Sequence, residues 1–213
     1  MTLNRRSLQY AQWAYKGICD LLNNKELEFF TVKFDWNDPD SKRLLTKTLY
    51  DNVFHATNTH TGFITQDSVD ARIEYEMNPK FDKNGKKKPY QPCFDHVTTP
   101  QFLARFLVDR KREIFDYSKE GYDKFLYWFE FATNVIETTN PENTAVRQFT
   151  SFRGGNYRIY ESSDKKYRRA GLVLCQRPDG VTEWSKAVPT DSVFVFNQDC
   201  LLYTSPSPRD NTG

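Results

Sequence analysis

Apolar residues recur every three to four positions in four stretches of the chain, and this helical periodicity constrains the fold more than any other feature. The stretches are residues 7–22, 41–55, 102–114 and 122–135. Such spacing places the apolar side chains on one face of a helix, where they can pack against neighbouring helices. A shorter helix is predicted from Asn143 to Phe149, so the chain should be mainly helical through Phe149.

Strand signals are shorter. Alternation, or enrichment in β-branched and aromatic residues, predicts strands at residues 27–36, 69–77, 157–160, 172–175 and 193–196. The segment from Asn58 to Asp70 is polar and indicates no element. We expect an α+β fold with a single domain over residues 1–199, in which the N-terminal two-thirds are mainly helical and a small antiparallel sheet lies near the C-terminus.

The composition is that of a folded protein with a polar surface. The chain contains 17 Phe, 12 Tyr and 4 Trp, which can bury enough apolar area to offset chain entropy in spite of a mean hydropathy of -0.75. Its net charge of +2, from 30 basic and 28 acidic residues, implies no partner by itself. A binding surface must therefore be a local cluster of charged residues.

The cysteines and the apolar runs indicate a protein that stays inside the cell. Cys19, Cys93, Cys175 and Cys200 are scattered and form no C-x-x-C pair, so neither a zinc knuckle nor a redox motif is predicted. Reduced thiols fit a cytoplasmic location. The N-terminus has no signal-peptide pattern, and no apolar run approaches the roughly 18 residues of a membrane span. We expect no membrane partner.

The last fourteen residues differ in character from the rest of the chain. The string from Cys200 to Asp210 resembles one reading frame of a sequencing-adapter end, and the alternative is a Ser/Pro-rich disordered terminus. Both interpretations remove residues 200–213 from the fold. Under the first, the natural C-terminus is missing from the sequence.

Two basic clusters are candidates for contact with nucleic acid. The first is a loop with an Asn84-Gly85 turn, and its candidate residues are Lys83, Lys86, Lys87, Lys88 and Tyr90. Its lysines can contact phosphates and its tyrosine can stack on a base. The second cluster consists of Lys165, Lys166, Arg168 and Arg169. The alternative for both is an exposed, solvated turn, which is the usual role of a charge run.

Three polar positions form the most informative pattern: the pair Asp95-His96, then Asn134, then Asn143. An imidazole can act as a general base, and a neighbouring carboxylate supplies a hard oxygen ligand for a cation. Asn143, at the entry of a predicted helix, offers a second oxygen. Thr99 and Pro100 predict that another helix begins just after the Asp-His pair.

This pattern resembles the HNH, or His-metal finger, nucleases over residues 94–149. The resemblance rests on Phe94-Asp-His-Val-Thr-Thr-Pro-Gln-Phe102 and on Asn134-Val-Ile-Glu-Thr-Thr-Asn-Pro-Glu-Asn143. It implies a DNA endonuclease with a ββα-metal finger, in which His96 activates water and Asp95 and Asn143 hold Mg²⁺ or Mn²⁺. Asn134 would brace the loop. The Lys that the family usually has after the last ligand is missing, but Arg147 lies one turn beyond Asn143 and could approach a phosphate. The chain also resembles proteins of marine tailed phages.

The sequence departs from the family pattern, and other interpretations stay open. About 37 residues separate His96 from Asn134, where the family usually has a short loop, and no cysteine pair supports the finger. Asn143 is alternatively a helix cap, and the Asp-His pair a surface or helix-entry pair. The alternative function is therefore a non-catalytic protein that binds nucleic acid or interacts with a host component.

Overall fold

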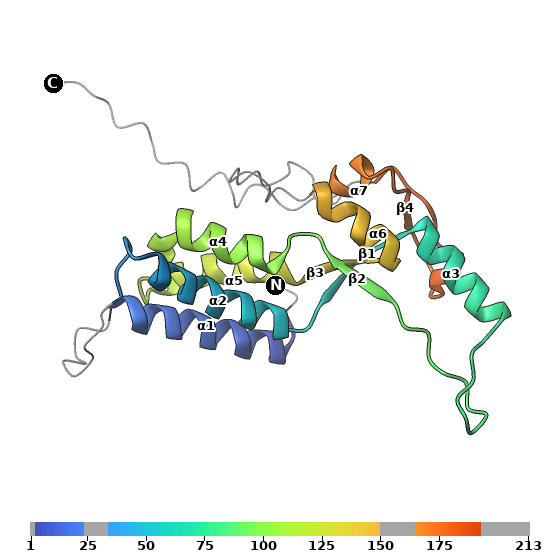
Figure 1. Ribbon diagram of the computed structural model, residues 1–213, viewed down its shortest axis with the longest axis horizontal. Helices are drawn as coiled ribbons and strands as arrows, with labels where there is room; N and C mark the ends of the chain where they lie inside the picture. The colour runs from blue at the N-terminus through green and yellow to red at the C-terminus, as the bar shows by residue number, and fades with distance from the viewer. Residues whose placement is uncertain (1–2, 24–33, 150–164, 193–213) are drawn as a thin grey trace.

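The computed structural model describes residues 3–23, 34–149 and 165–192. The predicted strands at 157–160 and 193–196, most of the one at 27–36, and the segment 200–213 lie outside the described residues. The fold is α+β, as predicted, with a group of long helices beside a small sheet (Figure 1).

The elements follow in chain order. The helices are α1 (Arg5–Asn23), α2 (Pro39–His55), α3 (Gln66–Met77), α4 (Pro100–Arg110), α5 (Lys119–Thr133), α6 (Asn140–Val146) and α7 (Lys165–Arg169). Short 3₁₀ turns are η1 (Arg112–Ile114), η2 (Arg147–Phe149) and η3 (Trp184–Lys186). The strands are β1 (Thr59–Thr65), β2 (Cys93–His96), β3 (Asn134–Thr138), β4 (Leu174–Gln176) and β5 (Val188–Pro189).

Helices α1, α2, α4 and α5 pack together around an apolar core, as their periodicity predicts. Fully buried side chains such as Ile18, Leu49, Leu107 and Phe129 come from all four helices. Helix α4 begins where the sequence indicates, because the Thr99 hydroxyl accepts the backbone N–H of Phe102 at 3.3 Å. Within the described ranges, no helix is both long and apolar enough to cross a membrane.

Gly121 lies in the first turn of α5, where a close approach requires glycine. A Cβ atom at this position would lie 2.2 Å from the carbonyl oxygen of Ile114 and 2.8 Å from the Tyr15 hydroxyl. That hydroxyl itself donates to the Ile114 carbonyl at 3.0 Å. The glycine therefore allows α1, η1 and α5 to meet closely.

The sheet has the strand order β2-β3-β1-β4-β5. It is mixed rather than antiparallel, because β1 and β3 run parallel while the other neighbours are antiparallel. The chain between β1 and β3 contains α3, α4 and α5, which gives the long crossover that parallel neighbours need.

The strand predicted at residues 69–77 is wrong, because these residues belong to helix α3. The alternation from Val69 to Met77 does not mark a buried strand face, because Val69 is buried but Ile73 and Met77 are exposed. The segment is rich in Ala, Arg, Glu and Met, which favour helices. The polar stretch before it, for which the sequence indicates no element, forms β1.

The two faces of the sheet have different neighbours. Helices α6 and α7 cover one face, where Tyr167 and Val146 pack with Ile136 of β3. Helix α3 and η3 lie against the other face, where Val69 and Trp184 pack with Ile64 of β1. A side chain on a strand therefore meets one of two separate environments.

Candidate functional site

Strand β2 places the Asp95 and His96 side chains on opposite faces of the sheet. The strand pairs regularly with β3, with Asp95 opposite Ile136 and His96 opposite Val135. Successive side chains of a strand alternate between the two faces. Asp95 contacts α7, whereas the ring of Phe94, on the His96 face, contacts the ring of His60 at 5.9 Å. The adjacent pair in the sequence is therefore not a pair in space.

The Asp95 carboxylate lies in a buried network with two residues of α7. Its Oδ2 atom accepts the Lys166 ammonium at 2.6 Å and the Tyr167 hydroxyl at 2.7 Å. Lys166 is 1% exposed, and burial lowers its pKa while the attraction of Asp95 opposes that change. Burial and Asp95 both raise the pKa of Tyr167, so its hydroxyl stays protonated and donates. The network compensates a charge that would be costly to bury alone.

Two histidines share the face of the sheet opposite Asp95. His60 of β1 and His96 of β2 both lie in register with Val135, which stands between them. The Nε2 atom of each is buried and has no hydrogen-bond partner in the described part of the chain. Burial lowers the pKa of both, to about 4 for His60, so both rings are neutral at pH 7. A general base must contact the attacking water, and Nε2 of His96 is enclosed by protein.

The two asparagines of the pattern have distinct structural positions. Asn134 begins β3, and its carbonyl accepts the N–H of Val97 at 3.0 Å. The Asn143 amide lies 3.5 Å from the Sγ atom of Cys93, which shares the Asp95 face of β2. Asn143 is not the cap of α6, because the Thr139 hydroxyl and Glu142 form the capping box at that end.

The arrangement of these residues does not fit the predicted Mg²⁺ site. Asp95 directs its Oδ2 atom at a lysine, and His96 lies on the other face of the sheet from Asp95. Across residues 3–23, 34–149 and 165–192, no group of three or more His, Cys, Asp and Glu side chains could hold a metal ion. Strand β2 pairs with β3, and α6 follows β3 and contacts β2, but α4, η1 and α5 lie between the two strands in the chain.

The first basic cluster lies on an ordered hairpin between α3 and β2. Lys80 and Lys88 are joined by a backbone hydrogen bond of 2.8 Å, and Phe81 pairs with Lys87. The Asp82 carboxylate accepts the backbone N–H groups of two turn residues at 2.8 and 2.9 Å. At the turn Gly85 has a φ of +75°, a left-handed conformation that glycine adopts without strain.

The hairpin extends away from the helices and the sheet (Figure 1). Its predicted lysines, namely Lys83, Lys86, Lys87 and Lys88, are all exposed. Tyr90 at its base differs, because it is only partly exposed and its ring lies 4.6 Å from the Arg72 guanidinium. The Tyr75 ring packs beside it at 5.6 Å. Tyr90 is therefore held by protein side chains and is not an unrestrained stacking surface.

The second basic cluster is only partly a surface. Lys166 is buried against Asp95, so its prediction as a nucleic-acid contact is wrong. Arg168 and Arg169 are exposed and Lys165 is partly exposed, and Arg168 donates to the carbonyl of Ser192 at 3.2 Å. Arg147 is exposed in η2. Within the run Lys165–Arg169, Lys166 and Tyr167 therefore belong to the core, and Arg168 and Arg169 belong to the surface.

Two further features of the structure were not predicted from the sequence. Arg72 of α3 forms a bidentate ion pair with the buried Glu137. Its Nε and Nη2 atoms donate to the two carboxylate oxygens at 2.7 and 2.6 Å. A groove of about 740 Å³ between α2 and α4 is lined by Lys42, Lys47 and Arg105, among others. The spacing of Lys42, Arg43 and Lys47 along α2 could have indicated a basic helix face. The Arg72–Glu137 contact has no such signal, because it joins distant segments.

No protein-family model matches the chain, and no curated protein and no solved structure matches it. The HNH resemblance stays a prediction.

Proposed function

We propose that the protein binds nucleic acid through the phosphate backbone, with the hairpin of residues 80–90 as the main contact. The observation that supports the proposal best is the exposure of Lys83, Lys86, Lys87 and Lys88 on a projecting hairpin of defined conformation. Ammonium groups at such a projection can approach phosphates with little obstruction from the rest of the protein.

The charge of the hairpin is local. Residues 80–88 contain five lysines and one aspartate, a net charge of +4, in a chain whose total is +2. The oxygen Oδ1 of that aspartate, Asp82, accepts backbone N–H groups of the turn. The field at the hairpin is therefore strongly positive although the protein as a whole is nearly neutral. Binding by counterion release depends on this local density of cations.

The hairpin is preformed, which favours binding. The Asp82 turn and the hydrogen bond from the Tyr75 hydroxyl to the Lys88 carbonyl fix the backbone. Lys87 lies over the Tyr75 ring at 5.1 Å. Because the backbone is ordered before contact, binding loses less conformational entropy than it would with a flexible loop.

A matched pair of charge variants tests the proposal. Replacing Lys83, Lys86 and Lys87 with Gln should weaken binding to an oligonucleotide by about 100-fold at low salt, because three phosphate contacts are lost. The control replaces three exposed lysines of the helical part, Lys16, Lys119 and Lys124, with Gln. It changes the net charge equally and should leave the affinity within about threefold. Equal losses in both variants would refute the role of the hairpin.

Metal-dependent cleavage of DNA by an HNH-like site is the second candidate. It is favoured by the pairing of β2 with β3, by the contact of α6 with β2, and by the position of Asn143 on the Asp95 side of β2. As arranged, the Oδ2 atom of Asp95 is engaged by the Lys166 ammonium rather than open to a metal ion. Incubation of plasmid DNA with Mg²⁺ or Mn²⁺ tests it. Cleavage that His96→Ala abolishes, with DNA affinity retained, would support this candidate.

A further inference from the structure

A pocket at the base of the hairpin has the chemistry of a phosphate site. It lies between α3 and the hairpin stem and has a volume of about 470 Å³, within the roughly 300–1,000 Å³ of small-ligand pockets. Lys80, Lys88 and Tyr90 line it together with the amides of Asn78 and Gln91. Cations, a hydroxyl and amides are the donor groups that recognise a phosphate.

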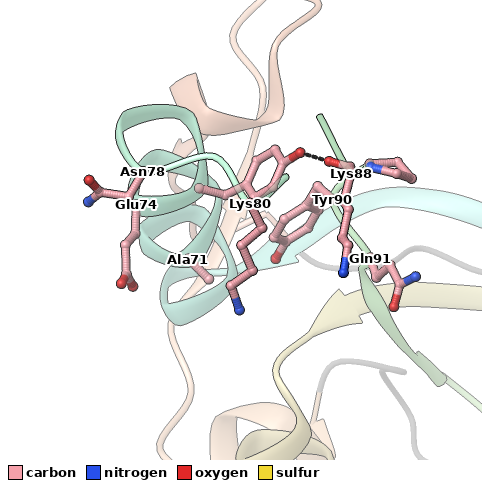
Figure 2. A pocket seen from close by; sticks show the side chains of 9 residues that line it. Ala71, Glu74, Asn78, Lys80, Lys88, Tyr90 and Gln91 are labelled. Atoms are coloured by element: carbon pink, nitrogen blue, oxygen red, sulfur yellow. Dashed lines mark hydrogen bonds between the residues drawn. The ribbon is translucent and has the colours of Figure 1, made fainter. Parts of the chain in front are cut away.

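The two cationic groups of this pocket flank the Tyr90 ring. In Figure 2 the Lys80 and Lys88 side chains lie on either side of the Tyr90 ring, and their ammonium groups point to the same side as the phenol oxygen. The carboxylate of Glu74 lies beyond Lys80, away from Tyr90 (Figure 2). The backbone hydrogen bond between Lys88 and Lys80 holds the two lysines as neighbours across the stem.

The tyrosine is a fixed donor. Arg72 at 4.6 Å and the Tyr75 ring at 5.6 Å hold its ring, and Arg72 is itself held by Glu137. Burial raises the pKa of Tyr90, so its hydroxyl keeps its proton at neutral pH. A donor of fixed position beside two lysines can orient one phosphate more sharply than surface lysines alone.

We propose that this pocket binds one unpaired nucleotide, and that the protein therefore prefers single-stranded nucleic acid. The phosphate lies between Lys80 and Lys88, and the base occupies the rest of the pocket, where amides can donate and accept. A base covered by protein cannot pair with a complementary strand at the same time. The inference rests on the proposed function, because the tip lysines continue the contact along the strand.

The test compares the affinity of the protein for a single-stranded oligonucleotide of about 20 nucleotides with its affinity for a duplex of equal length. This length exceeds the number of nucleotides that one single-strand-binding domain usually covers. The intact protein should bind the single strand about tenfold more tightly. Lys80→Gln should remove this preference, with a loss of about tenfold for the single strand and less than about twofold for the duplex. Tyr90→Phe, which keeps the ring on Arg72, should lose about threefold for the single strand only.

Lys83→Gln is the matched control, since it removes an equal charge from the same hairpin outside the pocket lining. It should weaken both complexes equally. If Lys80→Gln also weakens both equally, or if the intact protein binds both forms equally, the pocket inference is overturned and the proposed function stands. If the intact protein binds neither form, the proposed function itself fails. If thymidine monophosphate binds as tightly as the oligonucleotide, the pocket is a site for free nucleotides, and the proposal that it binds single-stranded nucleic acid is overturned.

Discussion

The helical and sheet regions of this protein bury different kinds of side chain. The core between α1, α2, α4 and α5 is built from aliphatic and aromatic residues. The buried charged residues of the described chain, by contrast, all belong to the sheet and to the helices that cover it. They are Asp95, Glu137, Glu142 and Lys166. One region is a scaffold held by apolar packing, while the other depends on specific polar partners.

This difference indicates which region of the protein positions its candidate functional groups. A buried charge costs stability unless its partner is correctly placed, so charges inside a small sheet region make its geometry specific. The Arg72–Glu137 pair also connects that region to the hairpin, because Arg72 stacks on Tyr90. The hairpin and its pocket are therefore positioned by the polar region, whereas the helical core serves the fold.

The largest expected effect comes from breaking the buried ion pair. Lys166→Met should destabilise the protein by about 3–5 kcal/mol, because the Asp95 charge is left buried without its cation. Urea denaturation measures this change. The control, Lys16→Met at the exposed Lys16–Asp20 pair, should cost less than about 1 kcal/mol. Similar losses of stability in both variants would show that the sheet region does not depend on its buried ion pair.

A pair of glycine substitutions tests the packing of the helical region. Gly121→Ala should destabilise the protein by about 3 kcal/mol, since its methyl group meets the Ile114 carbonyl at 2.2 Å. Gly17→Ala, in α1 with open space around it, should stabilise by about 0.5–1 kcal/mol through helix propensity. Thermal unfolding of both variants measures the effects. A harmless Gly121→Ala would mean that α5 does not approach η1 as described.

The pH dependence of stability should reflect the polar region. Burial, with Arg177 and Arg72 adding to it, lowers the pKa of His60 from 6.5 to about 4 in the folded state. The unfolded state binds more protons between these values. The contribution of His60 to stability is therefore present above pH 6.5 and is lost as the pH falls through that range.

The variant His60→Asn isolates this contribution, because its amide oxygen can still accept the N–H of Gly62. Between about pH 7 and about pH 4.5 the intact protein should lose about 2 kcal/mol more than the variant. This loss is smaller than the full free energy that corresponds to the pKa shift of His60, since solvent screens the partly exposed imidazole. Parallel stability curves for the two proteins would show that His60 does not titrate as described.

The helical region could be predicted from the sequence because its signals are local. The periodicity of residues 7–22 and the cap at Thr99 depend only on neighbours along the chain, and α1 and α4 begin close to where they are expected. Such signals need no knowledge of tertiary contacts. The Asn84-Gly85 turn was likewise predictable from its residue types, and the hairpin forms around it.

The sheet region could not be predicted in the same way. Strand β1 contains three threonines, a histidine and a glycine, which hide its period of two. Lys166 belongs to a basic run that is typical of a surface, and only its pairing with a residue far away in the sequence makes it buried. The Asp95-His96 pattern suggested one site, yet strand alternation separates the two side chains.

The salt dependence of binding to a single-stranded oligonucleotide is the most direct test of phosphate recognition by the hairpin. Four or five phosphate contacts along the hairpin predict that log Kobs falls with log salt with a slope of about -3, at roughly -0.7 for each contact. Replacing Lys83, Lys86 and Lys87 with Gln should reduce the slope by about 2 units. Binding that is insensitive to salt, or an equal slope in the two proteins, would contradict phosphate recognition by the hairpin.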